Sequence, residues 1–142
     1  MDSRIIGTWA LVATEWKRAD GRHANPFGAG AVGILMYDAA GNMSAQVMRA
    51  GRPTVPDDQP AGIDTAMASA VPGYIGYFGA YHVDEAAGIV THQVAGAAFP
   101  AWAGRDVPRR YRIDGDTLVL MDSVVAADGV AVEASTTWRR MG

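Results

Sequence analysis

The residue types best suited to chemistry in this 142-residue chain are ionisable or hydroxyl-bearing: His92, Arg110, Glu15 and Tyr81. His92 stands between Val90 and Val94, and residues two apart on a strand share one face. If that face lines an interior, the imidazole has a pKa suited to proton transfer near neutral pH. The alternative is a core histidine that is hydrogen-bonded to a neighbour.

Arg110 has two interpretations of the same kind. It shares a strand face with Arg112, whereas Tyr111 and Ile113 share the opposite face. The ordinary arrangement turns the arginines to solvent and the tyrosine to the core. In the alternative, Arg110 lies in a cavity, where its guanidinium binds a carboxylate, phenolate or enolate oxygen.

Glu15 and Tyr81 are the other two candidates. Simple alternation puts Glu15 on the face of Trp9, so its carboxylate acts as a base, pairs with Arg110 or His92, or is a rim residue in water. The Tyr81 hydroxyl is a candidate donor to a ligand carbonyl.

A group of aromatic residues and methionines predicts an adaptable apolar lining, part of which packs the core. The candidate ligand-binding residues are Tyr37, Met36, Met48, Tyr74, Tyr77, Phe78, Phe99 and Trp102.

Composition excludes several kinds of chemistry. The chain has no cysteine, so thiolate metal sites, disulfides and thiol catalysis are excluded. The three histidines follow no metal-ligand spacing, and no cofactor or metal is expected. The glycine-rich run 28–33 precedes a strand instead of opening a helix, so it is no dinucleotide motif. A net charge of -3 argues against nucleic-acid binding. No apolar run predicts a signal peptide or a membrane span, so we expect a cytoplasmic location.

The elements that must position these residues are short strands between Asp- and Gly-rich turns. We expect eight strands: Gly7–Trp16, Ala31–Tyr37, Met43–Arg49, Ala80–Asp84, Ile89–Ala97, Arg109–Ile113, Thr117–Val125 and Val130–Arg140. Eight strands joined by hairpins predict an all-β, up-and-down antiparallel β-barrel, formed by residues 1–142 as a single domain. The stretch Gly51–Gly79 is expected to hold a short helical insertion over one end of the barrel.

Several motifs resemble those of a known family. The Gly7-Thr8-Trp9 start and the terminal arginines are similar to the lipocalin signature, in which the tryptophan plugs the barrel and an arginine stacks on it. Further segments resemble the bacterial lipocalin-like domain family, a calycin-type barrel: residues 33–37, 41–46, 52–53, 73–81, 90–92, 100–104 and 110–111. The resemblance implies a lipocalin-like barrel, and it assigns no catalytic residue.

Two functions follow from a barrel of this composition. The first is binding of a small, mostly hydrophobic metabolite in the cavity. The alternative is a cofactor-free isomerase, cyclase, lyase or hydrolase, acting by acid–base chemistry on a small aromatic, polyketide or terpenoid substrate. A weaker third interpretation is a protein-interaction module that uses the aromatic cover. A homodimer is compatible with each of them.

Overall fold

Antiparallel strands make up nearly all of the structure, a computed structural model that describes residues 2–24, 27–52, 73–125 and 128–141. The strands are β1 (Gly7–Arg18), β2 (His23–Ala24), β3 (Val32–Tyr37), β4 (Asn42–Met48), β5 (Tyr74–Asp84), β6 (Ile89–Ala97), β7 (Asp106–Asp114), β8 (Thr117–Val125) and β9 (Ala131–Arg140). Two 3₁₀ turns, η1 (Ser3–Ile5) and η2 (Pro100–Trp102), complete the described elements.

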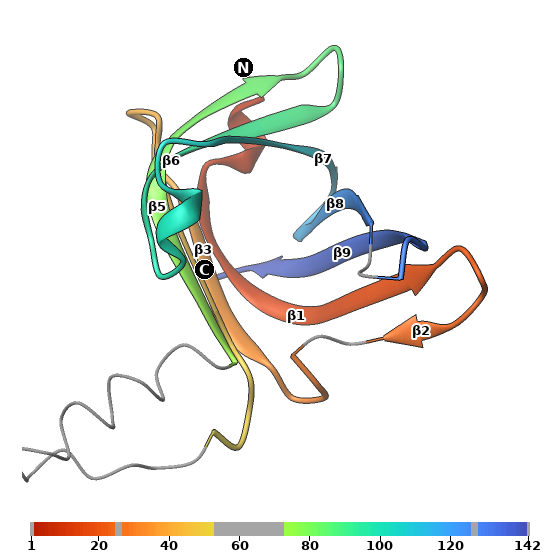
Figure 1. Ribbon diagram of the computed structural model, residues 1–142. Helices are drawn as coiled ribbons and strands as arrows, with labels where there is room; N and C mark the ends of the chain where they lie inside the picture. Colours follow the sequence, from red (N-terminus) through yellow and green to blue (C-terminus); the bar gives the residue numbers. More distant parts are fainter. Residues whose placement is uncertain (1, 25–26, 53–72, 126–127, 142) are drawn as a thin grey trace, which may run out of the picture.

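Eight of these strands close into a barrel. The strand order is β2-β1-β3-β4-β5-β6-β7-β8-β9, and β1 also pairs with β9 (Figure 1). The two residues of β2 only extend the end of β1. Because the barrel is closed, each of its strands is paired on both sides, which removes the exposed edges of an open sheet. The predicted eight-stranded up-and-down barrel is confirmed.

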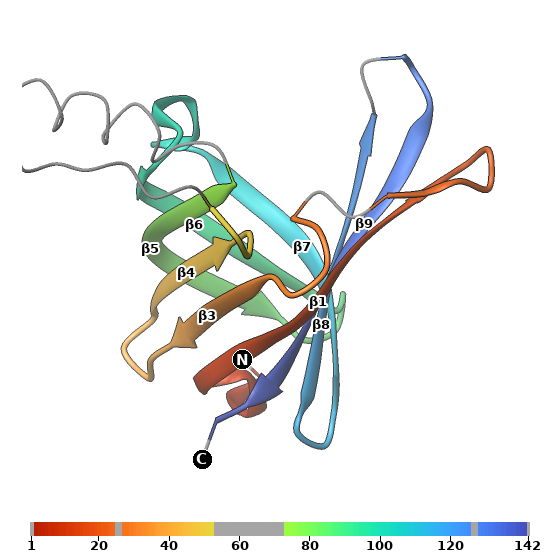
Figure 2. The same cartoon turned by 90° about the horizontal axis from the view of Figure 1, so that it is seen from below.

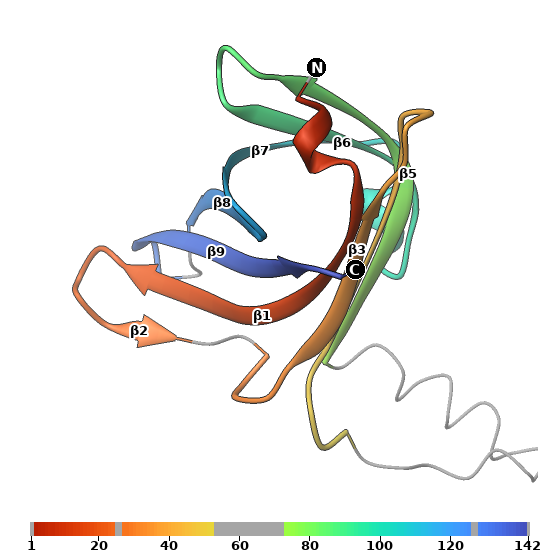
Figure 3. The ribbon, with the colours of Figure 1, turned by 180° about the vertical axis from the view of Figure 1, so that it is seen from behind.

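The barrel is not a uniform cylinder. Figure 2 shows the far ends of β1, β8 and β9 projecting away from the wall formed by β3 to β6. In Figure 3 the η1 turn lies within the ring of strands, beside the start of β1.

The region between β4 and β5 differs from the sequence-based expectation. β5 begins at Tyr74, six residues before the predicted start at Ala80, because Tyr74–Ala80 pairs in continuous register with β4. Aromatic and β-branched residues favour this extended pairing. The rest of the predicted helical insertion, residues 53–72, lies outside the described residues.

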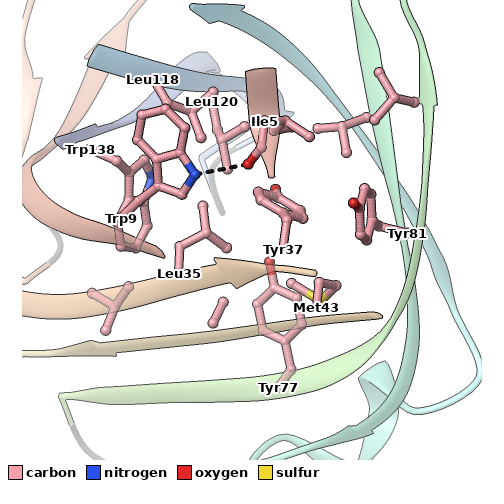
Figure 4. Packing of buried hydrophobic residues seen from close by; sticks show 14 of the residues in the cluster. Ile5, Trp9, Leu35, Tyr37, Met43, Tyr77, Tyr81, Leu118, Leu120 and Trp138 are labelled. Carbon is pink, nitrogen blue, oxygen red and sulfur yellow. Dashed lines mark hydrogen bonds between the residues drawn. The ribbon is translucent and has the colours of Figure 1, made fainter. Parts of the chain in front are cut away.

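The end of the barrel that holds the N-terminus is plugged as the family resemblance implies. The Trp9 side chain is fully buried, and its indole Nε1 donates to the Ile5 carbonyl at 3.0 Å (Figure 4). The Arg140 guanidinium lies 4.2 Å from the centre of the Trp9 ring and donates to the Ile6 carbonyl at 2.9 Å. One arginine from the last strand therefore fixes both the tryptophan and the backbone of the plug.

A core of buried side chains occupies the interior of the barrel. Inward side chains from all sides of the barrel contact one another there, among them Leu35, Tyr37, Met43, Tyr81 and Leu118 (Figure 4).

Candidate functional site

A cavity of about 250 Å³ lies at the end of the barrel opposite the plug, where β6 ends and β7 begins. Its lining residues are Tyr77, Trp102, Arg105, Val107, Arg109 and Asp122. The set combines two aromatic rings and an aliphatic side chain with two guanidinium groups and one carboxylate. It can hold an apolar ring beside a charged group.

The connection between β6 and β7 builds one wall of this cavity. Two backbone hydrogen bonds join this connection to Val94 of β6. The Gly104 N–H donates to the Val94 carbonyl at 2.8 Å, and the Val94 N–H donates to the Arg105 carbonyl at 2.9 Å. The η2 turn thereby holds Trp102 edge-on to Tyr77, with ring centres 5.6 Å apart. Phe99 also lies edge-on to the Trp102 ring, with ring centres 5.3 Å apart.

Strands β7 and β8 contribute a charged pair to the cavity. Alternation along β7 turns Val107 and Arg109 to the interior, and the Arg109 side chain is only 21% exposed. Its Nη1 lies 3.5 Å from the Asp122 Oδ2 of β8. Its Nε is buried and has no hydrogen-bond partner among the described residues. Arg109 thus brings a partly buried positive charge whose donors are incompletely used.

A hydrogen-bonded chain of two tyrosines and a histidine lies deeper in the barrel. The Tyr37 hydroxyl is 2.6 Å from His92 Nε2, and the Tyr77 hydroxyl is 2.8 Å from His92 Nδ1. Figure 4 shows both tyrosine side chains in the interior. Both ring nitrogens of His92, which is fully buried, are therefore paired.

Burial sets the protonation states of His92 and Tyr37. Loss of solvent, with a smaller effect from the positive charge of Arg109, lowers the pKa of His92 to about 3. Burial also raises the pKa of Tyr37 well above its usual value of 10. Near neutral pH the imidazole is therefore neutral and Tyr37 keeps its proton. A neutral imidazole has one donor and one acceptor nitrogen, so one tyrosine donates to His92 and the other accepts from it.

These contacts define how His92 relates to a ligand. It has no surface of its own in the cavity, since no part of the side chain is exposed. Tyr77 both binds His92 and lines the cavity, so Tyr77 is the side chain that connects the imidazole to a ligand there.

The structure does not bring the other three candidate catalytic residues to the cavity. Arg110 points outward, where its side chain is 52% exposed and pairs with Glu133. The arginine of β7 that faces inward is the preceding residue, Arg109. Tyr81 is buried, but its hydroxyl donates to the Asp38 carbonyl at 2.6 Å in the β3–β4 turn, away from the cavity lining.

Glu15 faces outward because β1 contains a bulge. The pairing of β1 with β9 shifts register between Leu11 and Ala13, so one extra residue reverses the alternation of the strand. Beyond the bulge Thr14 is buried and Glu15 is exposed, although Trp9 is buried before it. The expectation that Glu15 shares the face of Trp9 is therefore wrong.

The candidate ligand-binding residues divide between the two faces of the barrel wall. Tyr77 and Trp102 line the cavity, Phe99 packs behind Trp102, and Tyr37 lies in the interior against His92. The remaining four lie on the outer face of β3 to β5: Met36, Met48, Tyr74 and Phe78. Strict alternation explains the division, because Met36 precedes the inward Tyr37 and Phe78 follows the inward Tyr77.

Sequence reasoning missed four lining residues: Arg105, Val107, Arg109 and Asp122. A signal for Arg109 was present, since it lies two residues before Tyr111, on the face predicted to meet the core. Nothing in the sequence marked Arg105 or Asp122.

A second hollow, of about 350 Å³, lies near the β3–β4 turn. It is the larger of the two, but it is shallow and its walls include exposed residues such as Met36 and Asn42. It contains no guanidinium and no aromatic pair, so we regard the cavity beside Arg109 as the candidate site.

Two further features bear on the class of site. In the described part of the chain, no three histidine or acidic side chains gather as a metal site would require. None of its helices has the length and apolar character needed to cross a membrane.

A closed eight-stranded antiparallel barrel, plugged at one end by a tryptophan and hollow at the other, defines a lipocalin-like protein. Comparison with family models agrees, since the lipocalin-like domain matches residues 6–141. The chain belongs to this family. A comparison with curated proteins gave no match.

Proposed function

We propose that the protein binds a small, mostly hydrophobic molecule in the cavity between Trp102 and Arg109. The observation that carries this proposal is the cavity of about 250 Å³ whose walls include two aromatic rings. An engineered cavity of about 150 Å³ holds benzene, so this volume suits a ligand of one or two fused rings. Burying about 150 Å² of ligand apolar surface contributes about 4 kcal/mol before the costs of association.

Titration with 2-naphthamide, a neutral probe, tests this function by calorimetry and by the fluorescence of the naphthalene ring. We expect saturable binding to the wild type. Val107→Trp should abolish it, because Val107 lines the cavity and a larger side chain there fills the space. Val12→Trp is the matched control, since Val12 is 54% exposed on the outer face. Equal binding to both variants would contradict the assignment of this cavity.

A second candidate is cofactor-independent proton transfer on the bound molecule. The observation that favours it is the position of Tyr77, which lines the cavity and is hydrogen-bonded to His92. When Nδ1 carries the imidazole proton, His92 donates to the Tyr77 oxygen, which leaves the Tyr77 O–H free to protonate the bound molecule; the Tyr77 phenolate that remains keeps the hydrogen bond from neutral His92 until it takes a proton back from the same molecule. Isomerase, cyclase, lyase and hydrolase reactions all use such transfers.

This candidate is tested by turnover of a panel of enolisable aromatic, polyketide and terpenoid compounds. Tyr77→Phe should remove turnover while the protein still binds 2-naphthamide. Tyr81→Phe is the matched control, because the Tyr81 hydroxyl binds a backbone carbonyl away from the cavity. Full activity of Tyr77→Phe, or no turnover of any compound by the wild type, would reject catalysis.

A further inference from the structure

Arg109 is the feature of the cavity that simple hydrophobic binding leaves unexplained. Arginine is seldom drawn into an interior without partners for its charge and its N–H groups. Here the side chain is 21% exposed, yet its buried Nε donates to no other described residue. Burying an aliphatic side chain at this position would cost less free energy, so the guanidinium requires an explanation of its own.

Asp122 does not account for this guanidinium. Charge-assisted N–H···O bonds are normally about 2.7–2.9 Å long, whereas the Arg109–Asp122 pair is separated by 3.5 Å. The contact involves Nη1 alone, and it leaves the other donors of the guanidinium fork unpaired by Asp122.

The charge around the cavity favours anions. Two arginines, Arg105 and Arg109, and one aspartate line it, which leaves an excess of one positive charge in a chain whose net charge is -3. A field of this sign attracts an anionic ligand and repels a cation. Trp102 and Tyr77 meanwhile offer ring surfaces within the same cavity.

We propose that the ligand is a small aromatic or alicyclic organic acid, whose carboxylate or other anionic oxygen binds Arg109 while its ring packs against Trp102 and Tyr77. This inference rests on the proposed binding function and adds the chemical class of the ligand. Arg109 is then the residue that selects acids over neutral molecules of equal size.

Three probes with the same ring test the proposal: 2-naphthoate, 2-naphthamide and 2-naphthylmethylammonium, which are anionic, neutral and cationic. Their dissociation constants are measured by calorimetry at neutral pH and low salt. Hydrogen bonds to charged groups give discrimination of about tenfold to a hundredfold. We therefore expect 2-naphthoate to bind at least about tenfold more tightly than 2-naphthamide, and the ammonium probe to bind most weakly.

The neighbouring arginines of β7 supply matched variants. Arg109→Met should bring the affinity for 2-naphthoate to that for 2-naphthamide, with little change for the amide. Arg110→Met should leave both affinities unchanged, since Arg110 lies on the outer face beside Glu133. Asp122→Asn should tighten binding of 2-naphthoate alone, because it removes a competitor for Arg109. This last variant keeps the inference testable if Arg109→Met fails to fold.

The outcomes separate the two proposals. If 2-naphthamide or the ammonium probe binds as tightly as 2-naphthoate, the cavity binds ligands but the assignment to acids is wrong. The same conclusion follows if Arg109→Met keeps the preference for 2-naphthoate. If no probe binds the wild type, both this inference and the proposed function fail.

Discussion

Replacing His92 by glutamine should flatten the dependence of folding stability on pH. In the folded protein the pKa of His92 is about 3, against an ordinary value of 6.5, chiefly because of burial. Below pH 6.5 the unfolded chain therefore binds a proton that the folded protein excludes. The stabilisation is fully present above pH 6.5 and is lost progressively as the pH falls toward 3.

The size of the effect follows from the two pKa values. Each pH unit within this interval is worth about 1.4 kcal/mol. Between about pH 7 and pH 4.5, His92 should lower the free energy of unfolding by roughly 2–3 kcal/mol. Asp2 acts in a lower interval, since its hydrogen bond from Arg4 lowers its pKa from 3.8 to about 2. Stability due to Asp2 is therefore lost only as the pH falls through that range.

The assay is urea denaturation followed by tryptophan fluorescence at about pH 7 and about pH 4.5. Glutamine keeps a donor and an acceptor for the two tyrosines but does not titrate. His92→Gln should therefore lose roughly 2–3 kcal/mol less than the wild type between the two pH values, whatever its stability at pH 7. His82→Gln, a change on the exposed face of β5, is the control and should behave as the wild type.

Equal losses in the wild type and His92→Gln would refute the reasoning. Should the variant fail to fold, NMR titration of the wild type decides the matter. The His92 ring resonances should show no protonation at about pH 4.5. A midpoint near 6 would mean that the buried Tyr37–His92–Tyr77 chain does not keep the imidazole neutral.

Three further changes test the framework that holds the site. Arg140→Ala should lower the free energy of unfolding by about 2–4 kcal/mol in urea denaturation, because it removes both the Trp9 stacking and the hydrogen bond to the plug backbone. Gly79→Ala should lower the melting temperature more than Gly76→Ala: an added Cβ at Gly79 would lie 2.0 Å from a β6 carbonyl oxygen, whereas at Gly76 it first meets a movable glutamine side chain. Tyr37→Phe should cost about 1–3 kcal/mol in the same assay by leaving one nitrogen of the buried histidine unpaired, and an unchanged midpoint would contradict the hydrogen bond.

Local signals in the sequence were sufficient for the fold. Turns rich in aspartate and glycine separate the strands. Each strand of the barrel pairs with the next barrel strand along the chain, so the order of the barrel follows from the order of the sequence. The pairing of Trp9, near the start of the first strand, with Arg140, at the end of the last, could also be predicted, because a barrel must bring its first and last strands together. The early start of β5 was missed because Tyr74–Gly79 was assigned to the helical insertion expected in Gly51–Gly79.

The site was harder to predict because it depends on which face of each strand points inward. Residue type alone assigned both Met36 and Tyr37 to the lining of the ligand cavity, although neighbours on a strand point to opposite sides. Tyr111 was assigned to the core, yet Arg109 on the same face was overlooked in favour of Arg110. The partners of His92 come from strands 55 and 15 residues away in sequence, and no local pattern reports such distant contacts.

The bulge at residue 12 divides β1 into two segments, in which opposite sets of alternate residues face the interior. Before it, odd-numbered residues of β1 such as Trp9 belong to the plug; after it, even-numbered ones such as Thr14 face the interior. If β1 ran through residue 12 without a bulge, strict alternation would turn Glu15 and Lys17 toward the core. The bulge thus absorbs one residue of β1, which keeps these two charged side chains in water without any change to the plug.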